Sequence, residues 1–386
     1  MSPFRNVMLA LVLLAGVHTR AEVRPKGATM PLEVDENGML IVKVRLSSKK
    51  PKAQDREFRF ILDTGASLCV IDPSVPQEFL WDEPEKPSGG TSSVGDSTGK
   101  AIATRIVCLK RLAYAGMVRE DLMAYRMDLK GTMLGRLQDE PVDGILGMNF
   151  LRGTRFVLDP TAAQIRWWQD IPGHRVPLSI SQEANPTLTV RLSGTDVPCM
   201  LDTGDNGGFR MPGDAQASDH PEPFLYSGAA GEVRQGKRVQ VGRIEAGGRP
   251  WVKVPLDLVK FGEGGALIGR EVLLAAPLGL DFIDQWVTFT LDAQGHLPYR
   301  VMAPRPPLAW ERKAGGKRLR VVPVNPSSRW AKAGLMEGDE ALEVGPLKGG
   351  ALTLRAVRAF SDQGDAHTWL IRREGKTLLL KVPGAE

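Results

Sequence analysis

The sequence has few of the residues on which metal and thiol chemistry depend. Its 386 residues include only three cysteines and five histidines. The histidines stand alone, and no CxxC, HxH or HExxH spacing occurs. We therefore expect no metal site and no cofactor. Cys69, Cys108 and Cys199 each lie in an apolar stretch, so small buried hydrophobes are the simplest interpretation. One disulfide stays open as an alternative if the protein works in an oxidising compartment.

Long apolar runs and blocks of one charge are also missing. The apolar run Val7–Val17 is too short to span a bilayer, and no other stretch is long and apolar enough to be a membrane helix. The net charge is only +5, and the 50 basic and 45 acidic residues are scattered along the chain. We therefore expect neither stable membrane insertion nor nucleic-acid binding.

The N-terminal residues have the pattern of a secretory signal. Arg5 precedes the apolar run Val7–Val17, and Ala21 places a small residue at a plausible cleavage point. We expect residues 1–21 to be a signal peptide. The mature protein is then exported, to the periplasm or to the outside of the cell. A buried N-terminal strand is the alternative interpretation of the same run.

The composition of the remaining chain is typical of a mainly β protein. It is rich in turn-forming residues, with 42 glycines and 28 prolines, while long helical periodicities are scarce. Asn37-Gly38 lies between two apolar runs, which predicts a hairpin. The length is sufficient for two or three domains.

One stretch of the sequence occurs twice. Phe60–Ser67 and Cys199–Asn206 both run from apolar residues into Asp-Thr-Gly. Each copy follows two predicted strands and precedes a glycine-rich segment. Each then ends in an apolar-apolar-Gly segment, Ile145–Gly147 in the first copy and Leu267–Gly269 in the second. The same order of elements in both copies indicates an internal repeat.

Asp63 and Asp202 are the candidate catalytic residues of this repeat. A carboxylate beside an apolar run is costly unless it has partners, so two such sites predict carboxylates that meet. Two carboxyl groups that share one proton can activate water and protonate a leaving group. They titrate as a unit because like charges this close cannot both ionise. Gly65 and Gly204 permit the tight turns that let each backbone approach the other copy.

With these motifs the repeat resembles the aspartic protease superfamily, and most closely the short retropepsin-like units of bacteria, here in tandem. The resemblance covers about residues 28–300. It implies two retropepsin-like β-barrel lobes, residues 28–170 and 171–302, that pair within one chain as a pepsin-like pseudo-dimer. The implied activity is that of an aspartic endopeptidase on peptide or protein substrates, and the implied state is a monomer.

The resemblance also implies supporting roles around the two aspartates. Thr64 and Thr203 would hold the two turns together through hydroxyl and backbone hydrogen bonds. Ser67 would orient the outer oxygen of Asp63. Flaps that close over the substrate are expected at the glycine-rich segments. The candidate flap glycines are Gly95, Gly99, Gly228 and Gly231.

The second copy departs from the family pattern, because Asp205-Asn206 replaces Ala66-Ser67. Asn206 can still donate a hydrogen bond that orients Asp202. Asp205 adds a third carboxylate, which raises the pKa values of the pair if it points inward and favours basic substrate residues if it points outward. A peptide-binding protein with impaired catalysis is therefore the alternative function. Pairing of each unit with its twin in another chain is a third hypothesis.

A Pro-rich segment, Ala303–Pro307, indicates a linker to a C-terminal unit whose residue pattern differs from that of the repeat. We expect a strand at Leu319–Val324, a helix at Arg329–Ala333 and a terminal hairpin around Glu374-Gly375. Trp330–Asp339 carries Ala-Gly-Leu-x-x-Gly-Asp, which resembles the PDZ domains appended to exported bacterial proteases. This implies a PDZ domain over residues 303–386 that recruits or regulates and has a possible peptide ligand. Residues 315–319 are not the apolar glycine loop of that family, so the usual capture of peptide C-termini is not expected.

Overall fold

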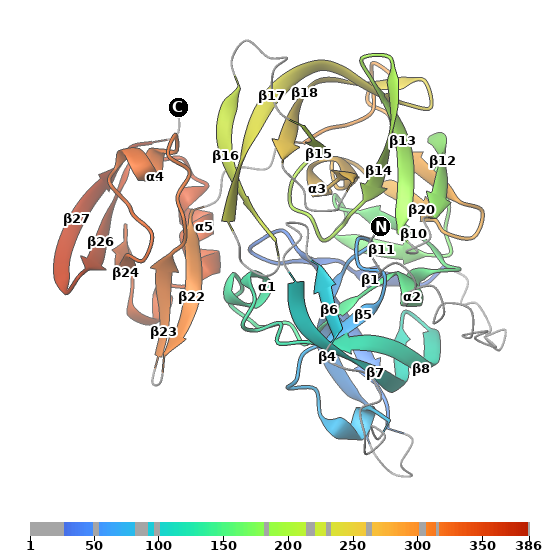
Figure 1. Cartoon of the computed structure of the whole chain (residues 1–386), viewed down its shortest axis with the longest axis horizontal. Coiled ribbons are helices and arrows are strands. Elements are labelled where there is room, and N and C mark those ends of the chain that lie inside the picture. The colour runs from blue at the N-terminus through green and yellow to red at the C-terminus, as the bar shows by residue number, and fades with distance from the viewer. Residues whose placement is uncertain are drawn as a thin grey trace, which may run out of the picture.

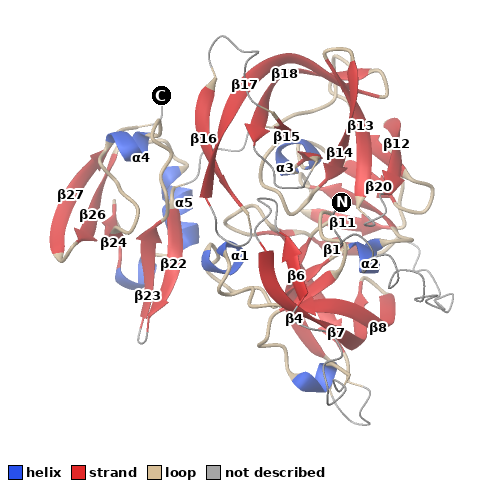
Figure 2. Cartoon of the chain, viewed as in Figure 1, coloured by secondary structure: helices blue, strands red, loops and turns tan. Residues whose placement is uncertain are grey.

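The computed structural model describes residues 27–48, 54–81, 92–95, 101–180, 185–213, 221–228, 233–259, 265–300, 306–313 and 316–384. The expected signal peptide, residues 1–21, lies outside these ranges, as do the flap candidates Gly99 and Gly231. The described chain is mainly β, which confirms that part of the expected fold class (Figures 1 and 2).

The first copy of the repeat folds into a closed barrel. Its strands are β2 (Glu33–Val34), β3 (Leu40–Leu46), β4 (Arg56–Leu62), β5 (Cys69–Ile71), β6 (Ser92–Gly95), β7 (Ala101–Tyr114), β8 (Met117–Arg126) and β9 (Gly144–Leu146). The pairing order β3-β4-β9-β5-β8-β7 returns to β3, so these six strands leave no open edge. We call this unit the first barrel. It also carries the one-turn helices α1 (Met133–Arg136) and α2 (Met148–Leu151).

The second copy repeats this topology. Its strands are β13 (Pro186–Leu192), β14 (Thr195–Leu201), β15 (Phe209–Pro212), β16 (Glu222–Ser227), β17 (Val233–Ala246), β18 (Arg249–Val259) and β19 (Ala266–Ile268), and β19 is followed by α3 (Arg270–Leu273). The order β13-β14-β19-β15-β18-β17 closes on β13 in the same way. This unit is the second barrel, and in Figure 1 it lies above the first.

A further set of six strands joins the two barrels. These strands are β1 (Thr29–Pro31), β10 (Arg155–Asp159), β11 (Gln164–Trp167), β12 (His174–Ile180), β20 (Leu278–Asp281) and β21 (Trp286–Phe289). The join is made where β10 of the first copy pairs with β20 of the second, with Phe156 opposite Leu280. Both barrels and this sheet share one large apolar core. The relative position of the two barrels is therefore set by backbone pairing as well as by packing.

Local sequence explains the strands that lead into the site. In β3 the side chains of Lys43 and Arg45 are exposed while their neighbours are buried, as expected for a strand with one face on a core. The predicted hairpin at Asn37-Gly38 is confirmed: β2 and β3 pair across it, and Gly38 has a φ of +71°. A left-handed backbone of this kind favours glycine.

None of the three cysteines, which all lie in the described part of the chain, forms a disulfide. Cys69 and Cys199 are fully buried in the common core. Burial raises the pKa of each of these two thiols to about 12, so both are held in the neutral form. They therefore act as small apolar side chains, and the alternative of a disulfide is not what the structure contains.

The C-terminal unit has a sheet and a core of its own. Its elements are β22 (Leu308–Lys313), β23 (Gly316–Val321), α4 (Arg329–Lys332), β24 (Glu340–Val344), β25 (Leu347–Lys348), α5 (Leu354–Ser361), β26 (His367–Arg373) and β27 (Lys376–Val382). The predicted helix and terminal hairpin are confirmed as α4 and β26–β27, and the predicted strand overlaps β23. Figure 1 shows this unit at the left, beside both barrels.

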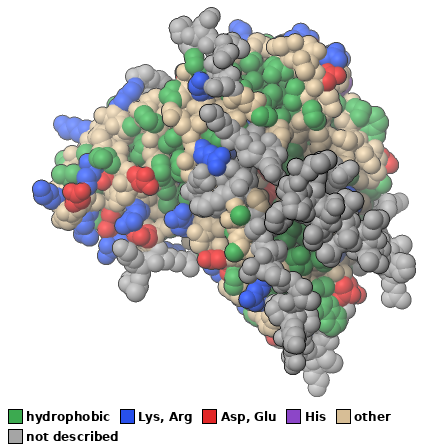
Figure 3. All heavy atoms as spheres, viewed as in Figure 1, with side chains coloured by type: hydrophobic (Ala, Val, Ile, Leu, Met, Phe, Trp, Pro, Cys, Tyr) green, Lys and Arg blue, Asp and Glu red, His purple; other side chains and the backbone are tan. Residues whose placement is uncertain are grey.

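The visible surface of the C-terminal unit carries basic and acidic side chains that are intermixed rather than separated (Figure 3). None of the helices in the described part of the chain is long and apolar enough to cross a membrane.

Candidate active site

The first Asp-Thr-Gly turn begins where β4 ends. Strand β4 runs parallel to β9, with Leu62 opposite Leu146, and the amide of Asp63 donates to the carbonyl of Leu146 (3.1 Å). The Oδ1 atom of Asp63 then accepts hydrogen bonds from the amides of Gly65 (2.8 Å) and Ala66 (3.2 Å). The carboxyl group is therefore fixed by the backbone of its own turn.

The second turn is built in the same way at the end of β14. The amide of Asp202 donates to the carbonyl of Ile268 (2.9 Å) in the parallel neighbour β19. The Oδ1 atom of Asp202 accepts from the amides of Gly204 (2.8 Å) and Asp205 (3.1 Å). The sequence repeat is thus also a repeat of hydrogen-bond geometry.

Thr64 and Thr203 link the two turns by four hydrogen bonds. The amide of Thr64 donates to the hydroxyl of Thr203 (3.0 Å), and the amide of Thr203 donates to the hydroxyl of Thr64 (3.1 Å). The hydroxyls donate in turn to the carbonyls of Leu201 (2.6 Å) and Leu62 (2.8 Å). Both threonines are fully buried, so every one of these bonds is protected from water.

The two glycines allow the carboxyl groups to meet. A Cβ atom on Gly65 would lie 2.5 Å from Cγ of Asp202, and one on Gly204 would lie 2.6 Å from Cγ of Asp63. Each carboxyl group therefore lies against the backbone of the opposite turn. Asp63 and Asp202 also share a side-chain hydrogen bond, and their carboxyl groups are buried between the two turns although each residue keeps some exposure. The arrangement leaves a carboxyl pair at the junction of the barrels.

The surroundings of the pair favour retention of a proton. Burial raises the pKa of Asp63, partly opposed by the hydrogen bond from the amide of Gly65. The pKa of Asp202 is raised further, first by burial, then by the negative charges of Asp63 and Asp205. The two carboxyl groups titrate as a unit, and their surroundings favour the state in which the pair keeps one proton.

Asp205 faces the protein interior rather than solvent. Its side chain is only 9 % exposed and forms an ion pair with the buried guanidinium of Arg210. Its Oδ1 atom also accepts from the amide of Gly207 (2.6 Å). Of the two orientations that the sequence left open, the structure therefore has the inward one. Arg210 balances the extra charge, so Asp205 is not an unpaired third carboxylate.

Two predicted orienting contacts are not found among the described residues. The side-chain oxygen of Asn206 accepts from Arg210 (3.5 Å), and no hydrogen bond joins Asn206 to Asp202. The hydroxyl of Ser67 likewise makes no hydrogen bond to Asp63 in this part of the chain, while the Ser67 carbonyl accepts from the amide of Asn149 (3.1 Å). The roles assigned to Ser67 and Asn206 stay predictions.

Sequence reasoning missed two buried side chains that hold the turns from behind. Arg270, which is 1 % exposed, donates to the carbonyls of Thr203 (3.0 Å) and Gly204 (3.4 Å). Asn185 donates to the carbonyls of Thr64 (3.3 Å) and Gly65 (2.6 Å). The available signal for Arg270 was its position, because a charged residue directly after the buried segment Leu267–Gly269 needs polar partners.

Arg270 also reaches the first barrel. Its Nη2 atom donates to the carbonyl of Asn37 (3.3 Å), and its Nη1 atom contacts Sδ of Met39 (2.7 Å). Burial lowers the pKa of Arg270, while the charges of Asp205 and Asp35 oppose that effect. One side chain therefore connects the second turn with the β2–β3 hairpin of the other barrel.

The flap candidates are not brought to the carboxyl pair by any contact in the described chain. Gly95 ends β6 and is exposed, with no other atom near the position of a Cβ. Gly228 follows β16 and is buried. Gly99 and Gly231 lie outside the described residues, so the flap role stays a prediction. Within the described ranges, no three His, Cys, Asp or Glu side chains are grouped as metal ligands would be.

Comparison with known protein families supports the first copy of the site. Residues 50–150 match the sequence model of a family described as aspartyl protease. That range includes the turn at Asp63 and strand β9, which pairs with the strand that leads into this turn. The match does not extend to the second barrel or to the C-terminal unit. No curated protein matches the chain significantly.

Proposed function

We propose that this protein is an aspartic endopeptidase that hydrolyses peptide bonds with an Asp63–Asp202 dyad. The observation that carries the proposal is the meeting of two carboxyl groups in turns that Thr64 and Thr203 cross-link. The aspartyl protease match over residues 50–150 supports the reaction class. The signal-like pattern of residues 1–21 supports export to the periplasm or the cell exterior.

The proposed reaction needs no group beyond the dyad and a water molecule. The ionised carboxylate, which we assign to Asp63 because the additional carboxylate Asp205 lies in the turn of Asp202, takes a proton from water as the water oxygen attacks the peptide carbonyl carbon. Protonated Asp202 gives its proton to the carbonyl oxygen, so a neutral tetrahedral diol forms. When the C–N bond breaks, the proton on Asp63 passes to the leaving nitrogen and Asp202 recovers its own. The dyad ends with the single proton with which it began.

We further propose that the two barrels act as a pseudo-dimer within one chain, so that a monomer is active. Each turn finds its hydrogen-bond partners in the other turn of the same chain, and β10 pairs with β20 across the junction. These contacts argue against pairing with a second chain. The C-terminal unit is proposed to be a PDZ domain that recruits substrate or a partner, on the resemblance of its Ala-Gly-Leu-x-x-Gly-Asp segment.

A cleavage assay tests the proposed reaction. Purified protein is incubated with unfolded protein substrates across acid to neutral pH, and the products are identified by mass spectrometry. We expect cleavage on the acid side, where the dyad keeps one proton, and inhibition by a statine-type peptide that mimics the tetrahedral diol. Tight peptide binding without cleavage at any pH would instead favour the alternative, a peptide-binding protein with impaired catalysis.

Asp205 offers a test of how the dyad is tuned. We expect Asp205→Asn to shift the alkaline limb of the pH–activity profile to lower pH. The reason is that the Asp205 charge raises the pKa of Asp202, so its removal lets the shared proton leave earlier. Asp284→Asn is the matched control, because Asp284 is an exposed partner of Arg155 (2.9 Å). An unmoved alkaline limb in Asp205→Asn would contradict the inference that the charge of Asp205 raises the pKa of Asp202.

A further inference from the structure

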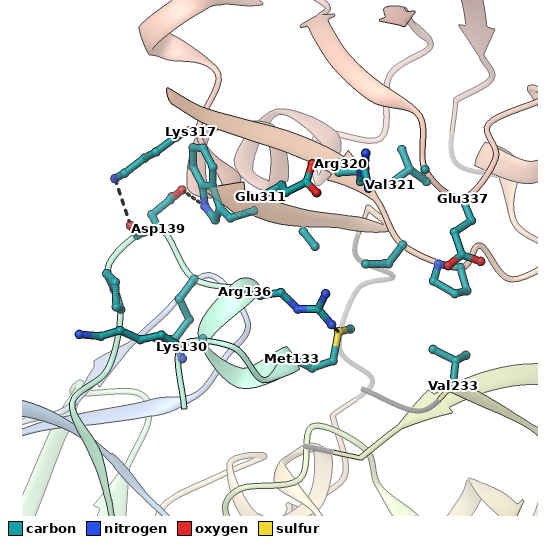
Figure 4. A pocket seen from close by; sticks show the side chains of 18 residues that line it. Lys130, Met133, Arg136, Asp139, Val233, Glu311, Lys317, Arg320, Val321 and Glu337 are labelled. Carbon is teal, nitrogen blue, oxygen red and sulfur yellow. Dashed lines mark hydrogen bonds and ion pairs between the residues drawn. The ribbon is translucent and has the colours of Figure 1, made fainter. Parts of the chain in front are cut away.

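The C-terminal unit does not share the apolar core of the barrels. Its core residues all lie within Leu308–Val382, and they form a cluster separate from that of the barrels. Between β22–β23 and the α1 region of the first barrel there is a cavity of about 450 Å³ (Figure 4). Apolar packing alone therefore does not hold this unit in place, and specific polar contacts matter more.

The main polar contact is made by Asp139 of the first barrel. Its carboxylate accepts from the amides of Leu354 (2.8 Å) and Arg355 (2.7 Å), at the start of α5, and from the indole N–H of Trp310 (2.7 Å) in β22. The first amides of a helix have no partner within it and carry partial positive charge, so a carboxylate suits them. Thr353 of the same helix caps only the amide of Ala356 (3.1 Å).

Figure 4 shows the approach of the two units at this point, with Asp139 beside Lys317 in the lining of the cavity. The Nζ atom of Lys317 donates to the carbonyl of Asp139 (3.4 Å). A side chain of the first barrel therefore completes the N-terminal cap of a helix in the C-terminal unit.

Charges around Asp139 are complementary across the same contact. Glu36, whose side chain is 4 % exposed, accepts from the amide of Asp139 and pairs with Arg355 (3.7 Å). Arg358 of α5 is buried, and its Nε and Nη1 atoms make no hydrogen bond within the described chain. Burial lowers the pKa of Arg358, and the nearby negative charges of Asp35, Glu36 and Asp139 oppose that effect. An acidic edge of the first barrel thus meets a basic face of α5.

The β2–β3 hairpin, which contains Glu36, also leads to the candidate active site. The side-chain amide of Asn37, next to Glu36, donates to the carbonyl of Leu137, and the Asn37 carbonyl accepts from Arg270 (3.3 Å). Arg270 in turn donates to the carbonyl of Thr203 (3.0 Å) in the second turn. Two sets of hydrogen bonds, connected by the peptide bond between Glu36 and Asn37, therefore lead from α5 to the turn that carries Asp202.

We propose that Asp139 is a latch that docks the C-terminal unit on the first barrel, and that docking positions the second Asp-Thr-Gly turn through Asn37 and Arg270. The proposal rests on the proposed function and adds a regulatory contact to it. When the C-terminal unit is docked, it holds the second Asp-Thr-Gly turn in position. When the hydrogen bonds of Asp139 break, the turn that carries Asp202 becomes more mobile.

Hydrogen exchange of the full-length protein tests the latch without any substrate. In Asp139→Ala we expect roughly fivefold to tenfold faster exchange at the amides of Leu354 and Arg355, because the cap that protects them is gone. Faster exchange is also expected in the segments 35–39 and 202–206. Glu140→Ala is the matched control. It removes the same charge from the adjacent residue, whose exposed side chain pairs only with Arg59 (3.0 Å) among the described ion pairs, and it should change neither region.

The possible outcomes separate the parts of the proposal. Faster exchange in α5 with no change at residues 202–206 would overturn the coupling to the active site. Unchanged exchange in α5 would overturn the latch itself. Faster exchange throughout β18 as well would mean general destabilisation, and Asp139→Leu, which nearly keeps the size of the side chain but accepts no hydrogen bond, must then reproduce the local pattern or the proposal fails. A lack of peptidase activity in the wild-type protein would count against the proposed function while the exchange result still decides the latch.

Discussion

Replacing Asp63 or Asp202 by Asn is expected to lower kcat for peptide hydrolysis by roughly a thousandfold or more. Asn has the shape of Asp and can still accept from the amide of Gly65 or Gly204, so both turns keep their geometry. What is lost is the group that accepts a proton from water in one variant and the group that protonates the carbonyl oxygen in the other. Rates are measured with a fluorogenic peptide at the acid optimum of the wild-type protein.

The same variants give a second result that does not depend on activity. The pKa values of both aspartates are raised in the folded protein, so the folded state binds more protons than the unfolded state near and above the unfolded pKa. Wild-type stability should therefore fall as pH rises through the folded pKa values, whereas each Asn variant loses part of that dependence. Melting temperatures across acid to neutral pH measure the difference.

Asp196→Asn is the control for the activity measurement. Asp196 lies at the exposed start of β14 and pairs with Arg191 (2.8 Å), away from the dyad. It should keep the activity of the wild-type protein. Full activity in either Asp63→Asn or Asp202→Asn would exclude a single shared dyad. An unchanged pH dependence of melting would show that the two carboxyl groups are not held in the protonated range.

Features that depend on neighbouring residues could be predicted from the sequence. The mainly β class follows from short apolar runs between turn residues, and the hairpin at Asn37-Gly38 follows from two residues alone. Both Asp-Thr-Gly turns were located because the repeat places them after strands of the same pattern. In each case the physical cause lies within a few residues, so periodicity and turn chemistry are enough.

Features that depend on distant partners could not be predicted in this way. The parallel pairing of β4 with β9 brings Leu62 to Leu146 across a long connection, and no local pattern specifies it. The side chains of Asn206 and Asp205 turn to Arg210 because that cation is buried beside them, which the sequence order does not reveal. Arg270 and Asp139 are found only when the barrels and the C-terminal unit are seen together.

The glycines of the two turns should be as sensitive as the aspartates. We expect Gly65→Ala and Gly204→Ala each to lower kcat/KM by at least about a hundredfold, because displacement of a catalytic group by about 1 Å is enough for such a loss. A Cβ at either position would lie within 2.6 Å of the opposite carboxyl carbon, far inside van der Waals contact. The turns cannot simply move apart, since the buried threonines and Asn185 hold them from behind.

Gly242→Ala separates this effect from the general cost of replacing glycine in a strand. Gly242 lies in β17 of the second barrel, and no other atom lies within 4 Å of its added Cβ. This control should keep full activity and melt at or slightly above the wild-type temperature, because alanine restricts the unfolded chain. If Gly65→Ala retained the activity of Gly242→Ala, the carboxyl of Asp202 could not lie against the first turn during catalysis, and the dyad geometry itself would be wrong.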